Sequence, residues 1–535
     1  MSSNLKQETL REKMKLIAKE HYQKTDSQND FNLIDHGSDQ GKYVYFIGIG
    51  GAGMSAIAKI LINEGYIVSG SDMECSPVTY ELGELGVRIN TKQDGEYLEP
   101  DTNLVITSAA INENNPDLKK ARSLGLKVVK YSEFLGSLMK RKYGIAISGT
   151  HGKTTTTAMI STILQKTGHE PTFVIGGNVT EIGGNSCIGK GSHFVAEACE
   201  FDRTFLNLTP QIGVITNIEE DHLDYYKDLD GITEAFTEFV SLIPEDGLLV
   251  VNNDDTNIRK VIKGAKCKVQ SYSIATISDV LNKAIPARKR GLQTYSDEVP
   301  IADESYERVN CEPDAKWLAV VTYSDKNVSH FSVFKKGEYF GDFCLKTPGL
   351  HNVSNALAAI SVCNYIGLNG KTVKKALASF NGVSRRFQTI SSKNGITIID
   401  DFAHHPTAIK ATLATARAIY PSQRIWCVFQ PHQHNRTKLL LREFALALTL
   451  ADKVIIADIY AARDSDREKA SVSSLDLKCE LQAIGGDVEC AKNNSEIINN
   501  LRLSVKEDDV VMILGAGDIW KIAHGLKDIL ESEYD

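Results

Sequence analysis

The chain has 535 residues, of which 42% are hydrophobic and 24% are charged, and its formal net charge is −8. This composition is typical of a globular protein, and a prior of roughly 150 residues per domain predicts two to four domains. The acidic balance argues against a nucleic-acid-binding protein, which needs a basic face, but it leaves room for small anionic ligands.

Cysteine usage and the lack of long apolar runs predict a cytoplasmic protein. The ten cysteines form no C-x-x-C pair, which favours reduced thiols over a disulfide framework or a zinc site. Residues 1–40 are polar and lack the apolar core of a signal peptide, so they are interpreted as an N-terminal extension. No apolar run reaches about 18 residues, so no membrane insertion is expected.

The first organised unit, residues 41–141, opens with a strand, a glycine-rich turn and a helix. From Tyr43 the chain reads YVYFIGIGGAGMSAIAKILINEGYIVSGSD, in which a second strand ends at Asp72. Small residues in such a turn let the backbone approach a phosphate, and the following helix offers its N-terminus. Because an acid in this place binds a ribose in dinucleotide-binding folds, a dehydrogenase is the competing interpretation. The predicted ligand contacts are Gly48, Gly50, Gly51, Ala52, Gly53, Met54, Ser55 and Asp72.

The second unit, residues 142–383, begins with the apolar run Tyr143–Ile147, followed by SGTHGKTTTT and a helical pattern. Strand, glycine loop and helix form a phosphate cradle, because loop N–H groups and the helix dipole face one point. Lys153 adds a full charge, and the Thr154 hydroxyl can bind Mg²⁺. A plain strand-to-helix turn is the alternative, but it does not explain the lysine. The predicted ATP contacts in this loop are Gly149, Thr150, His151, Gly152, Lys153, Thr154 and Thr155.

Two further strands of the second unit end in charged residues. VAEACEFD places Glu197 directly after an apolar run, and NIEEDHLDYY places His222 after the next one. In open α/β sheets, ligands bind beyond the carboxyl ends of parallel strands. Thr154, Glu197 and His222 are therefore predicted to hold a hard cation beside a nucleotide. Glu220 and Asp221 are interpreted as solvated loop charges.

The remainder of the second unit is less regular. Residues 275–315 lack a clear hydrophobic period and are interpreted as an insertion, whereas residues 319–347 alternate and predict antiparallel strands. In PGLHNVSNALAA, one histidine and two asparagines stand at the start of an alanine-rich helix. They either contact a base or sugar, or they cap the helix. These residues are His351, Asn352 and Asn355.

The third unit, residues 384–535, begins with the basic segment SRRF. Its alternating pattern predicts a second doubly wound parallel sheet. Its strands end in the polar segments DDFAHHP, QPHQHNRT, DIYAARDSD and GAGD. The proline of DDFAHHP favours a helix start at that point. Polar side chains are again expected to gather at the carboxyl ends of the strands, where open sheets bind ligands.

These motifs occur in one order, namely GIGGAGMS, GTHGKTTTT, VAEACEFD, NIEEDHLDYY, LHNVSNALAA, GVSRRFQ, DDFAHHPTAI and FQPHQHNRT. The series resembles the Mur ligases of peptidoglycan synthesis from Tyr43 to His524, and it is far more specific than either glycine loop alone. The resemblance implies an α/β protein with three domains: a Rossmann-like UDP-sugar-binding domain (41–141), a central P-loop ATPase-like domain with a mixed sheet (142–383) and a Rossmann-like amino-acid-binding domain (384–535). It decides against a dehydrogenase, because the first glycine loop of this family binds the pyrophosphate of a UDP sugar.

Within the family, the pattern is most similar to members that join L-alanine to the carboxylate of UDP-N-acetylmuramate. The resemblance implies ATP and Mg²⁺ as cofactors and an acyl-phosphate intermediate, and a monomer or homodimer is expected. Lys153 is implied to contact the β- and γ-phosphates. The implied metal ligands are Thr154, Glu197 and His222, and the implied catalytic residues are Lys153, Glu197, His222 and His404.

Other residues are assigned by the resemblance to the edges of the site. The implied adenine contacts are His351, Asn352 and Asn355. The implied nucleotide contacts near the hinge are Arg386 and Asp401. Arg436 and His404 are implied to face the amino-acid acceptor, and His404 is also the expected base.

Three positions on the acceptor side depart from the family pattern. Phe402 stands where the family usually has tyrosine, Ala403 where it has glycine, and Gln433 where it has arginine. DDFAHHPTAI is also similar to a relative that attaches a recovered tripeptide to the same UDP sugar, so a tripeptide is the alternative acceptor. A non-catalytic UDP-sugar-binding protein is the alternative of another class, and the intact phosphate loop argues against it.

Overall fold

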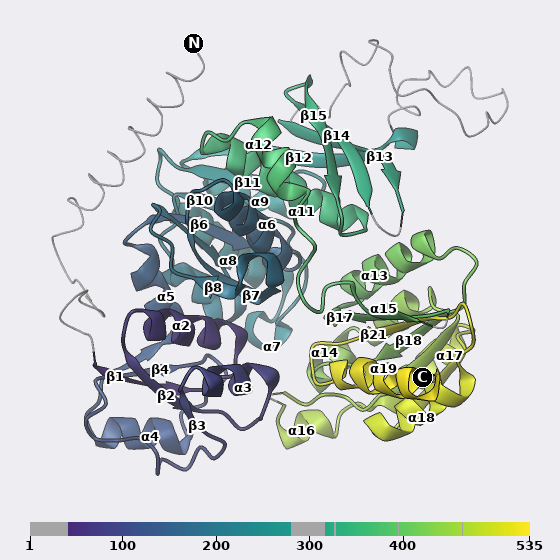
Figure 1. Cartoon of the computed structure of the whole chain (residues 1–535), viewed down its shortest axis with the longest axis horizontal. Coiled ribbons are helices and arrows are strands. Elements are labelled where there is room, and N and C mark those ends of the chain that lie inside the picture. The colour runs from purple at the N-terminus through teal and green to yellow at the C-terminus, as the bar shows by residue number, and fades with distance from the viewer. Residues whose placement is uncertain (1–40, 280–315, 326–327, 394, 463, 535) are drawn as a thin grey trace.

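The computed structural model of the chain describes residues 41–279, 316–325, 328–393, 395–462 and 464–534. Three sheets organise it, and each forms a unit with its own helices (Figure 1). The N-terminal unit lies beneath the central unit in this view, and the C-terminal unit lies beside both. No helix in the described ranges is long and apolar enough to cross a membrane. The predicted N-terminal extension and most of the predicted insertion at 275–315 lie outside the described residues.

The N-terminal unit is a five-stranded parallel sheet in the order β3-β2-β1-β4-β5. Its strands are β1 (Tyr43–Ile47), β2 (Ile67–Ser71), β3 (Arg88–Asn90), β4 (Leu104–Thr107) and β5 (Val128–Lys130). Its helices are α2 (Ala52–Asn63), α3 (Pro77–Glu84), α4 (Pro116–Ser123) and α5 (Tyr131–Met139). The strand order reverses between β1 and β4, so the glycine turn after β1 lies at the point where open α/β sheets bind ligands.

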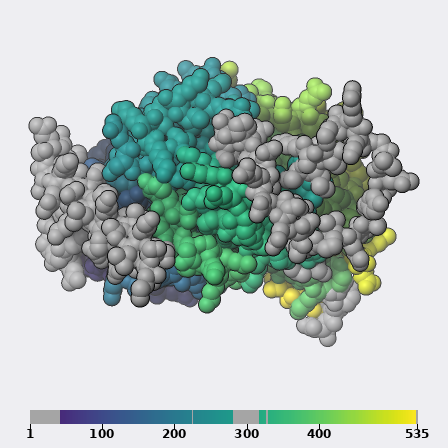
Figure 2. All heavy atoms as spheres, turned by 90° about the horizontal axis from the view of Figure 1, so that it is seen from above, coloured from purple at the N-terminus to yellow at the C-terminus, as the bar shows by residue number. Residues whose placement is uncertain are grey.

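The central unit is a ten-stranded mixed sheet in the order β15-β14-β13-β12-β11-β10-β6-β9-β7-β8. Its strands are β6 (Tyr143–Ser148), β7 (Thr172–Val179), β8 (Gly184–Cys187), β9 (His193–Glu197), β10 (Ile212–Ile215), β11 (Leu248–Asn252), β12 (Lys268–Thr276), β13 (Trp317–Ser324), β14 (Ser329–Lys335) and β15 (Glu338–Leu345). Its α-helices are α6 (Lys153–Lys166), α7 (Leu223–Tyr226), α8 (Leu229–Ser241), α9 (Ile258–Val261), α11 (Leu350–Tyr365) and α12 (Gly370–Leu377). The antiparallel strands predicted for 319–347 are confirmed by the pairing of β13, β14 and β15. Seen from above, the teal and green atoms of this unit occupy the middle of the molecule (Figure 2).

The C-terminal unit is a six-stranded sheet in the order β16-β17-β21-β18-β19-β20. Its strands are β16 (Gln388–Lys393), β17 (Ile396–Asp401), β18 (Ile425–Phe429), β19 (Lys453–Ala457), β20 (Val488–Ala491) and β21 (Val510–Leu514). Its helices are α13 (Pro406–Ile419), α14 (His434–Leu439), α15 (Leu441–Leu448), α16 (Asp466–Lys469), α17 (Ser474–Ala483), α18 (Asn494–Ser504) and α19 (Trp520–Tyr534). The predicted parallel sheet is wrong at one edge, because β16 pairs antiparallel with β17. Two residues separate these strands, and so short a connection permits only a hairpin.

The three units share their apolar cores unequally. One buried cluster joins the two first units, because it contains Val44 and Phe134 of the N-terminal unit together with Phe194 and Phe236 of the central unit. The two large clusters of the C-terminal unit contain only residues between 396 and 530 among their fully buried members. Among the described residues, the C-terminal unit therefore shares no buried apolar cluster with the other two units, and an interface without a shared core permits relative motion more readily.

Candidate active site

The phosphate loop connects β6 to α6 and is held by two glycines with positive φ. Gly149 has φ +127° and Gly152 has φ +83°, conformations that L side chains rarely adopt. A Cβ atom on Gly152 would lie 2.5 Å from Oδ1 of Asn355, so the asparagine packs directly against the loop. The loop is fixed from the other side by Asn217, which accepts the N–H of His151 at 2.8 Å through its side chain and that of Thr150 at 3.0 Å through its carbonyl.

Lys153, the first residue of α6, forms a buried ion pair that the sequence did not indicate. Its Nζ donates to Oε2 of Glu200 at 2.8 Å and to the carbonyl of Thr150 at 3.2 Å. Burial by itself lowers the pKa of Lys153, but the carboxylate of Glu200 more than offsets this, so the net pKa is raised and the amine is charged. The lysine is therefore poised at a helix N-terminus with its charge intact. The second acid of VAEACE was the available signal for Glu200, although local sequence does not distinguish it from a loop charge.

Glu197 ends β9 and lies against Thr154. The Thr154 hydroxyl donates to Oε2 of Glu197 at 3.1 Å, and the N–H of Gly176 donates to Oε1. Burial raises the pKa of Glu197, while Gly176 and Lys153 oppose the rise. A buried carboxylate beside a hydroxyl offers two oxygen donors of the kind that Mg²⁺ prefers, and a cation here would favour the ionised form. These two residues therefore fit the expected metal ion.

His222 occupies a different wall of the site from Glu197. It has φ +53° and stands directly before α7. Its Nε2 lies 3.9 Å from Oδ2 of Asp221, and its ring lies 4.9 Å from that of Phe201. Its buried Nδ1 has no hydrogen-bond partner among the described residues. The structure thus pairs Thr154 with Glu197, while His222 keeps one ring nitrogen available for a ligand.

The first glycine turn lies at the boundary between the N-terminal and central units. Asp72 accepts the N–H of Gly50 at 2.8 Å and that of Glu74 at 3.1 Å. Its carboxylate, which was predicted to contact a ligand, therefore holds the backbone of the glycine turn. Gly48 has φ +84°. Gly51 and Ala52 are exposed, whereas the side chains of Met54 and Ser55 are buried in α2. The exposed backbone of the turn is therefore the part that a ligand can approach.

A cavity of about 190 Å³ extends from Gly53, beside this turn, to Glu197, which contacts Thr154 of α6. A Cβ atom on Gly53 would lie 2.4 Å from the hydroxyl of Tyr131, so only glycine fits at this point of its wall. Glu197 lines the cavity from the opposite unit. The full lining is Gly53, Tyr131, Ser132, Leu135, Val174, Gly176, Glu197, Cys199, Thr204, Phe205 and Leu208. A ligand bound at the first turn can therefore extend one end to Glu197.

The expected adenine contacts lie at the start of α11. This helix begins at Leu350, so His351 and Asn352 are inside it rather than before it, and Gly349 occupies the capping position without a side chain. The capping alternative for the asparagines is therefore wrong. Asn352 donates to the carbonyl of Pro348 at 2.6 Å, whereas His351 is exposed.

Two arginines, Arg385 and Arg386, stand where the chain enters the C-terminal unit, and two aspartates at the end of β17 lie against them. Arg386 lies 3.5 Å from the Thr154 hydroxyl and 4.9 Å from the centre of the Phe402 ring, so it connects the hinge to the phosphate loop. Asp401 accepts the N–H groups of Phe387 and Ala403, both at 2.7 Å. The carboxylate of Asp401 is thus occupied in holding the hinge backbone, and Arg386 is the residue that reaches the site.

Asp400 is buried next to this hinge, and its raised pKa makes the stability of the protein depend on pH. Burial raises its pKa to about 6 although Arg385 lies 3.2 Å away, and its Oδ1 has no hydrogen-bond partner among the described residues. The folded protein therefore binds a proton that the unfolded chain releases near its ordinary value of 3.8. Stability from this group is present at low pH and is lost as the pH rises from about 4 to about 6, at about 1.4 kcal/mol per pKa unit, or about 3 kcal/mol in all.

We expect the Asp400→Asn variant to escape this loss. Its free energy of unfolding, measured in urea at steps across that pH window, should rise relative to wild type as the pH increases. Asp466→Asn, at a fully exposed position, should follow the wild-type profile. Parallel profiles for wild type and Asp400→Asn would contradict the assignment.

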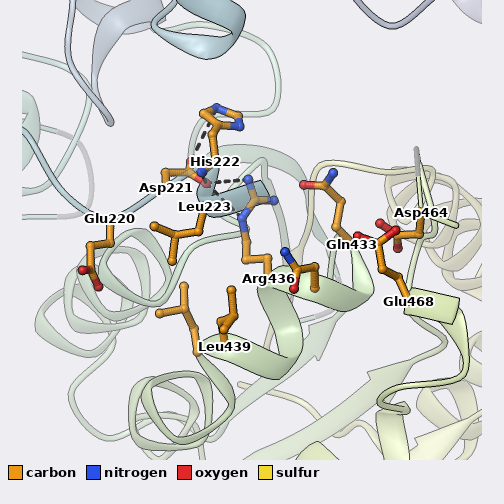
Figure 3. Close-up of a pocket in the computed structure, with 11 residues that line it drawn as sticks. Glu220, Asp221, His222, Leu223, Gln433, Arg436, Leu439, Asp464 and Glu468 are labelled. Carbon is orange, nitrogen blue, oxygen red and sulfur yellow. Dashed lines mark hydrogen bonds and ion pairs between the residues drawn. The ribbon is translucent and has the colours of Figure 1, made fainter. Parts of the chain in front are cut away.

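The acceptor side is built around an ion pair between the central and C-terminal units. Nη2 of Arg436 donates to Oδ1 of Asp221 at 2.6 Å, and both side chains are more than nine-tenths buried (Figure 3). His222 and Arg436 hold the pKa of Asp221 well below its ordinary value against the opposing effect of burial. The interpretation of Asp221 as a solvated loop charge is therefore wrong, because its partner arrives from a segment 215 residues away. Glu220 is exposed, as expected.

A second cavity, of about 40 Å³, opens beside this ion pair. It is lined by Glu220, Asp221, His222, Leu223, Gln433, Asn435, Arg436, Leu439, Leu440, Asp464 and Glu468 (Figure 3). Gln433, which departs from the family pattern, lines this cavity and has φ +69°. The other two departures lie apart from it: Phe402 packs under Arg386, and Ala403 is buried.

His404 lies between these features and is neutral at ordinary pH. Its Nδ1 lies 2.9 Å from the carbonyl of Phe402, and its ring lies 5.7 Å from that of His432. Because a carbonyl oxygen only accepts, Nδ1 carries the proton and Nε2 is free to accept one. Burial lowers the pKa of His404 well below its ordinary value, and the charge of Arg436 adds to this.

Comparison with known proteins identifies the family. Residues 43–143 match the model described as "Mur ligase family, catalytic domain", residues 147–363 the "Mur ligase middle domain", and residues 385–517 the "Mur ligase, glutamate ligase domain". The chain is 40% identical to a UDP-N-acetylmuramate–L-alanine ligase of Acetivibrio thermocellus, covering 90% of this chain and 94% of that protein. It is also 40% identical to the protein of the same name from Clostridium acetobutylicum, covering 91% and 98%.

Solved structures agree with this result. The chain is similar to the UDP-N-acetylmuramate-alanine ligase of Thermotoga maritima, with a TM-score of 0.73, 27% identity, and coverage of 92% of this chain and 99% of that one. A murein peptide ligase of Psychrobacter arcticus shares the fold, with a TM-score of 0.67, 24% identity, and coverage of 92% and 99%. The predicted three-sheet α/β fold is confirmed, and the chain belongs to the Mur ligase family.

Proposed function

We propose that this chain joins L-alanine to the carboxylate of UDP-N-acetylmuramate in peptidoglycan precursor synthesis, using ATP and Mg²⁺. The observation that carries the proposal is the position of Glu197, which contacts Thr154 at the start of α6 and lines the cavity that reaches Gly53 of the first glycine turn. A carboxylate in this position supports the proposal that a UDP sugar and ATP meet beside Glu197, because an acyl group must there meet a γ-phosphate. The names of the relatives at 40% identity support the same substrates.

The first step activates the carboxylate. An oxygen of the sugar carboxylate attacks the γ-phosphorus of ATP, the bond to the β-phosphate oxygen breaks, and ADP leaves an acyl phosphate behind. Lys153 and the N-terminus of α6 stabilise the negative charge that develops on the phosphoryl oxygens. Mg²⁺ bound by Thr154 and Glu197, with His222 as a further ligand, would neutralise phosphate charge.

The second step forms the amide. The amine of L-alanine attacks the acyl carbon, and the tetrahedral intermediate expels inorganic phosphate. The amine attacks in its neutral form, and its nitrogen becomes a stronger acid in the tetrahedral intermediate. The unprotonated Nε2 of His404 is the candidate acceptor for the proton released at that stage. The Arg436 guanidinium lines the neighbouring cavity and is the candidate partner of the amino-acid carboxylate.

A recovered tripeptide is the second candidate acceptor, and it is favoured only by the sequence DDFAHHPTAI. The names of the relatives at 40% identity favour L-alanine. A non-catalytic UDP-sugar-binding protein would have no use for a charged lysine at a phosphate loop, and ATP turnover distinguishes it.

Phosphate release tests the proposal directly. The protein is incubated with ATP, Mg²⁺ and UDP-N-acetylmuramate, and with L-alanine, glycine, L-serine or the tripeptide L-Ala-γ-D-Glu-diaminopimelate. We expect strong turnover with L-alanine, and a baseline without acceptor or with the metal chelated. Turnover with the tripeptide alone would assign the protein to recycling. Release with none of the acceptors would favour the binding protein.

A further inference from the structure

Three side chains from separate elements converge at the contact between the phosphate loop and the C-terminal unit. His151 belongs to the loop between β6 and α6, Glu219 follows β10, and His405 stands directly before α13. One ligand atom from each residue lies within 4.8 Å of the other two. Oε2 of Glu219 is 3.6 Å from Nε2 of His151 and 3.8 Å from Nδ1 of His405. The rings of the two histidines are 4.9 Å apart.

The ring nitrogens that face this point differ in their partners. Nε2 of His405 lies 3.1 Å from the carbonyl of Glu220 and therefore carries the proton, so Nδ1 has a lone pair. That lone pair accepts the N–H of Thr407 at 3.4 Å, a long hydrogen bond that a metal ion would replace. Burial, together with the neighbouring His151, lowers the pKa of His405 to about 4, so the ring is neutral at ordinary pH. Nε2 of His151 is buried and has no hydrogen-bond partner among the described residues.

The carboxylate of Glu219 is ionised and held in place. Burial raises its pKa, but the nearby His151 ring and the hydrogen bond from Thr407 more than offset this, so the net pKa is lowered. The Thr407 hydroxyl donates to the same Oε2 at 2.6 Å, which fixes the carboxylate between the two imidazoles. Two imidazoles and one carboxylate are the donor set of a three-ligand zinc site.

The spacing also suits such an ion. With metal–ligand bonds of about 2.1 Å, the donor atoms of a tetrahedral site are about 3.4 Å apart. The two separations to Glu219 are close to that value, and the two histidine nitrogens lie within 4.8 Å of each other. Mg²⁺ prefers oxygen ligands in octahedral geometry, so this cluster differs in chemistry from the pair formed by Thr154 and Glu197.

We propose that His151, Glu219 and His405 bind a divalent transition-metal ion of the zinc type across the interface between the central and C-terminal units. The ion adds three coordinate bonds to an interface that already contains the ion pair between Asp221 and Arg436. It holds the start of α13 against the phosphate loop, and it leaves a fourth position for water or an anion.

Cobalt absorption tests the site on the full chain. Co²⁺ is added with Mg²⁺ in excess, which occupies oxygen-rich sites, and the visible spectrum is recorded. We expect one Co²⁺ per chain, with the strong visible bands of a four-coordinate ion and without the near-ultraviolet band of a thiolate ligand. Zn²⁺ should displace it and abolish the bands.

The variants are chosen to preserve the fold. Glu219→Gln keeps the shape of the side chain, and His405→Asn keeps a residue that caps helices well. Each should weaken Co²⁺ binding at least about tenfold. Glu220→Gln, in the same loop but exposed, should bind as wild type does. Melting curves establish that the variants are folded. The proposal is overturned if wild type binds no Co²⁺, or if both ligand variants bind it with unchanged affinity.

Discussion

Replacing Lys153 by alanine should lower turnover on the order of 10²–10³-fold, the scale of losing one stabilising donor at a charge that develops in the transition state. The amine is charged and stands at the first position of α6, where its only carboxylate partner among its described hydrogen bonds is Glu200. ATP binding should weaken less than turnover falls, because the loop N–H groups and the helix dipole remain.

Two controls separate this effect from loss of structure. Lys166→Ala changes an exposed lysine in the last turn of the same helix and should leave turnover unchanged. Lys153→Ala also leaves Glu200 buried without its cation, so the double variant with Glu200→Gln should recover stability but not turnover. A nearly normal rate in Lys153→Ala would contradict the assignment of the loop to phosphate.

The second large effect is expected at the ion pair between Arg436 and Asp221. Arg436→Met leaves a carboxylate more than nine-tenths buried without its arginine, and breaking a buried ion pair in this way costs about 3–5 kcal/mol. The loss should appear as a lower free energy of unfolding in urea. The pair joins the central unit to α14 of the C-terminal unit, so the variant should weaken the interface between these two units.

A double-mutant cycle tests whether the two residues act as a pair. Asp221→Asn combined with Arg436→Met removes both charges and should recover most of the stability lost by the single change. Lys438→Ala, at an exposed position of the same helix, should cost little. If Arg436→Met is no more harmful than Lys438→Ala, the ion pair does not support the interface.

The departures from the family pattern differ in what they touch. Gln433 lines the small cavity beside Arg436, so it is the departure placed to influence the choice of acceptor. The ring of Phe402 lies about 5 Å from the guanidinium groups of Arg385 and Arg386. Phenylalanine can make this cation–π contact as tyrosine would, because both present an aromatic face. Acceptor preference is therefore expected to depend on Gln433 more than on Phe402.

Local sequence determined the parts of this protein in which neighbouring residues suffice. The glycine turns after β1 and β6, the lysine at the start of α6, and the acid at the end of β9 follow from short patterns, because a strand, a turn and a helix start are made by adjacent residues. The same reasoning predicted the antiparallel strands β13, β14 and β15.

Tertiary structure decided which charges are buried and what they meet. Asp221 looks like a loop charge until Arg436 arrives from 215 residues away, and Glu200 becomes the partner of Lys153 only when β9 lies beside β6. His405 meets the phosphate loop only because the C-terminal unit packs there. A charge is stable in the interior only with its partner, and chain distance hides that partner from any pattern of neighbouring residues.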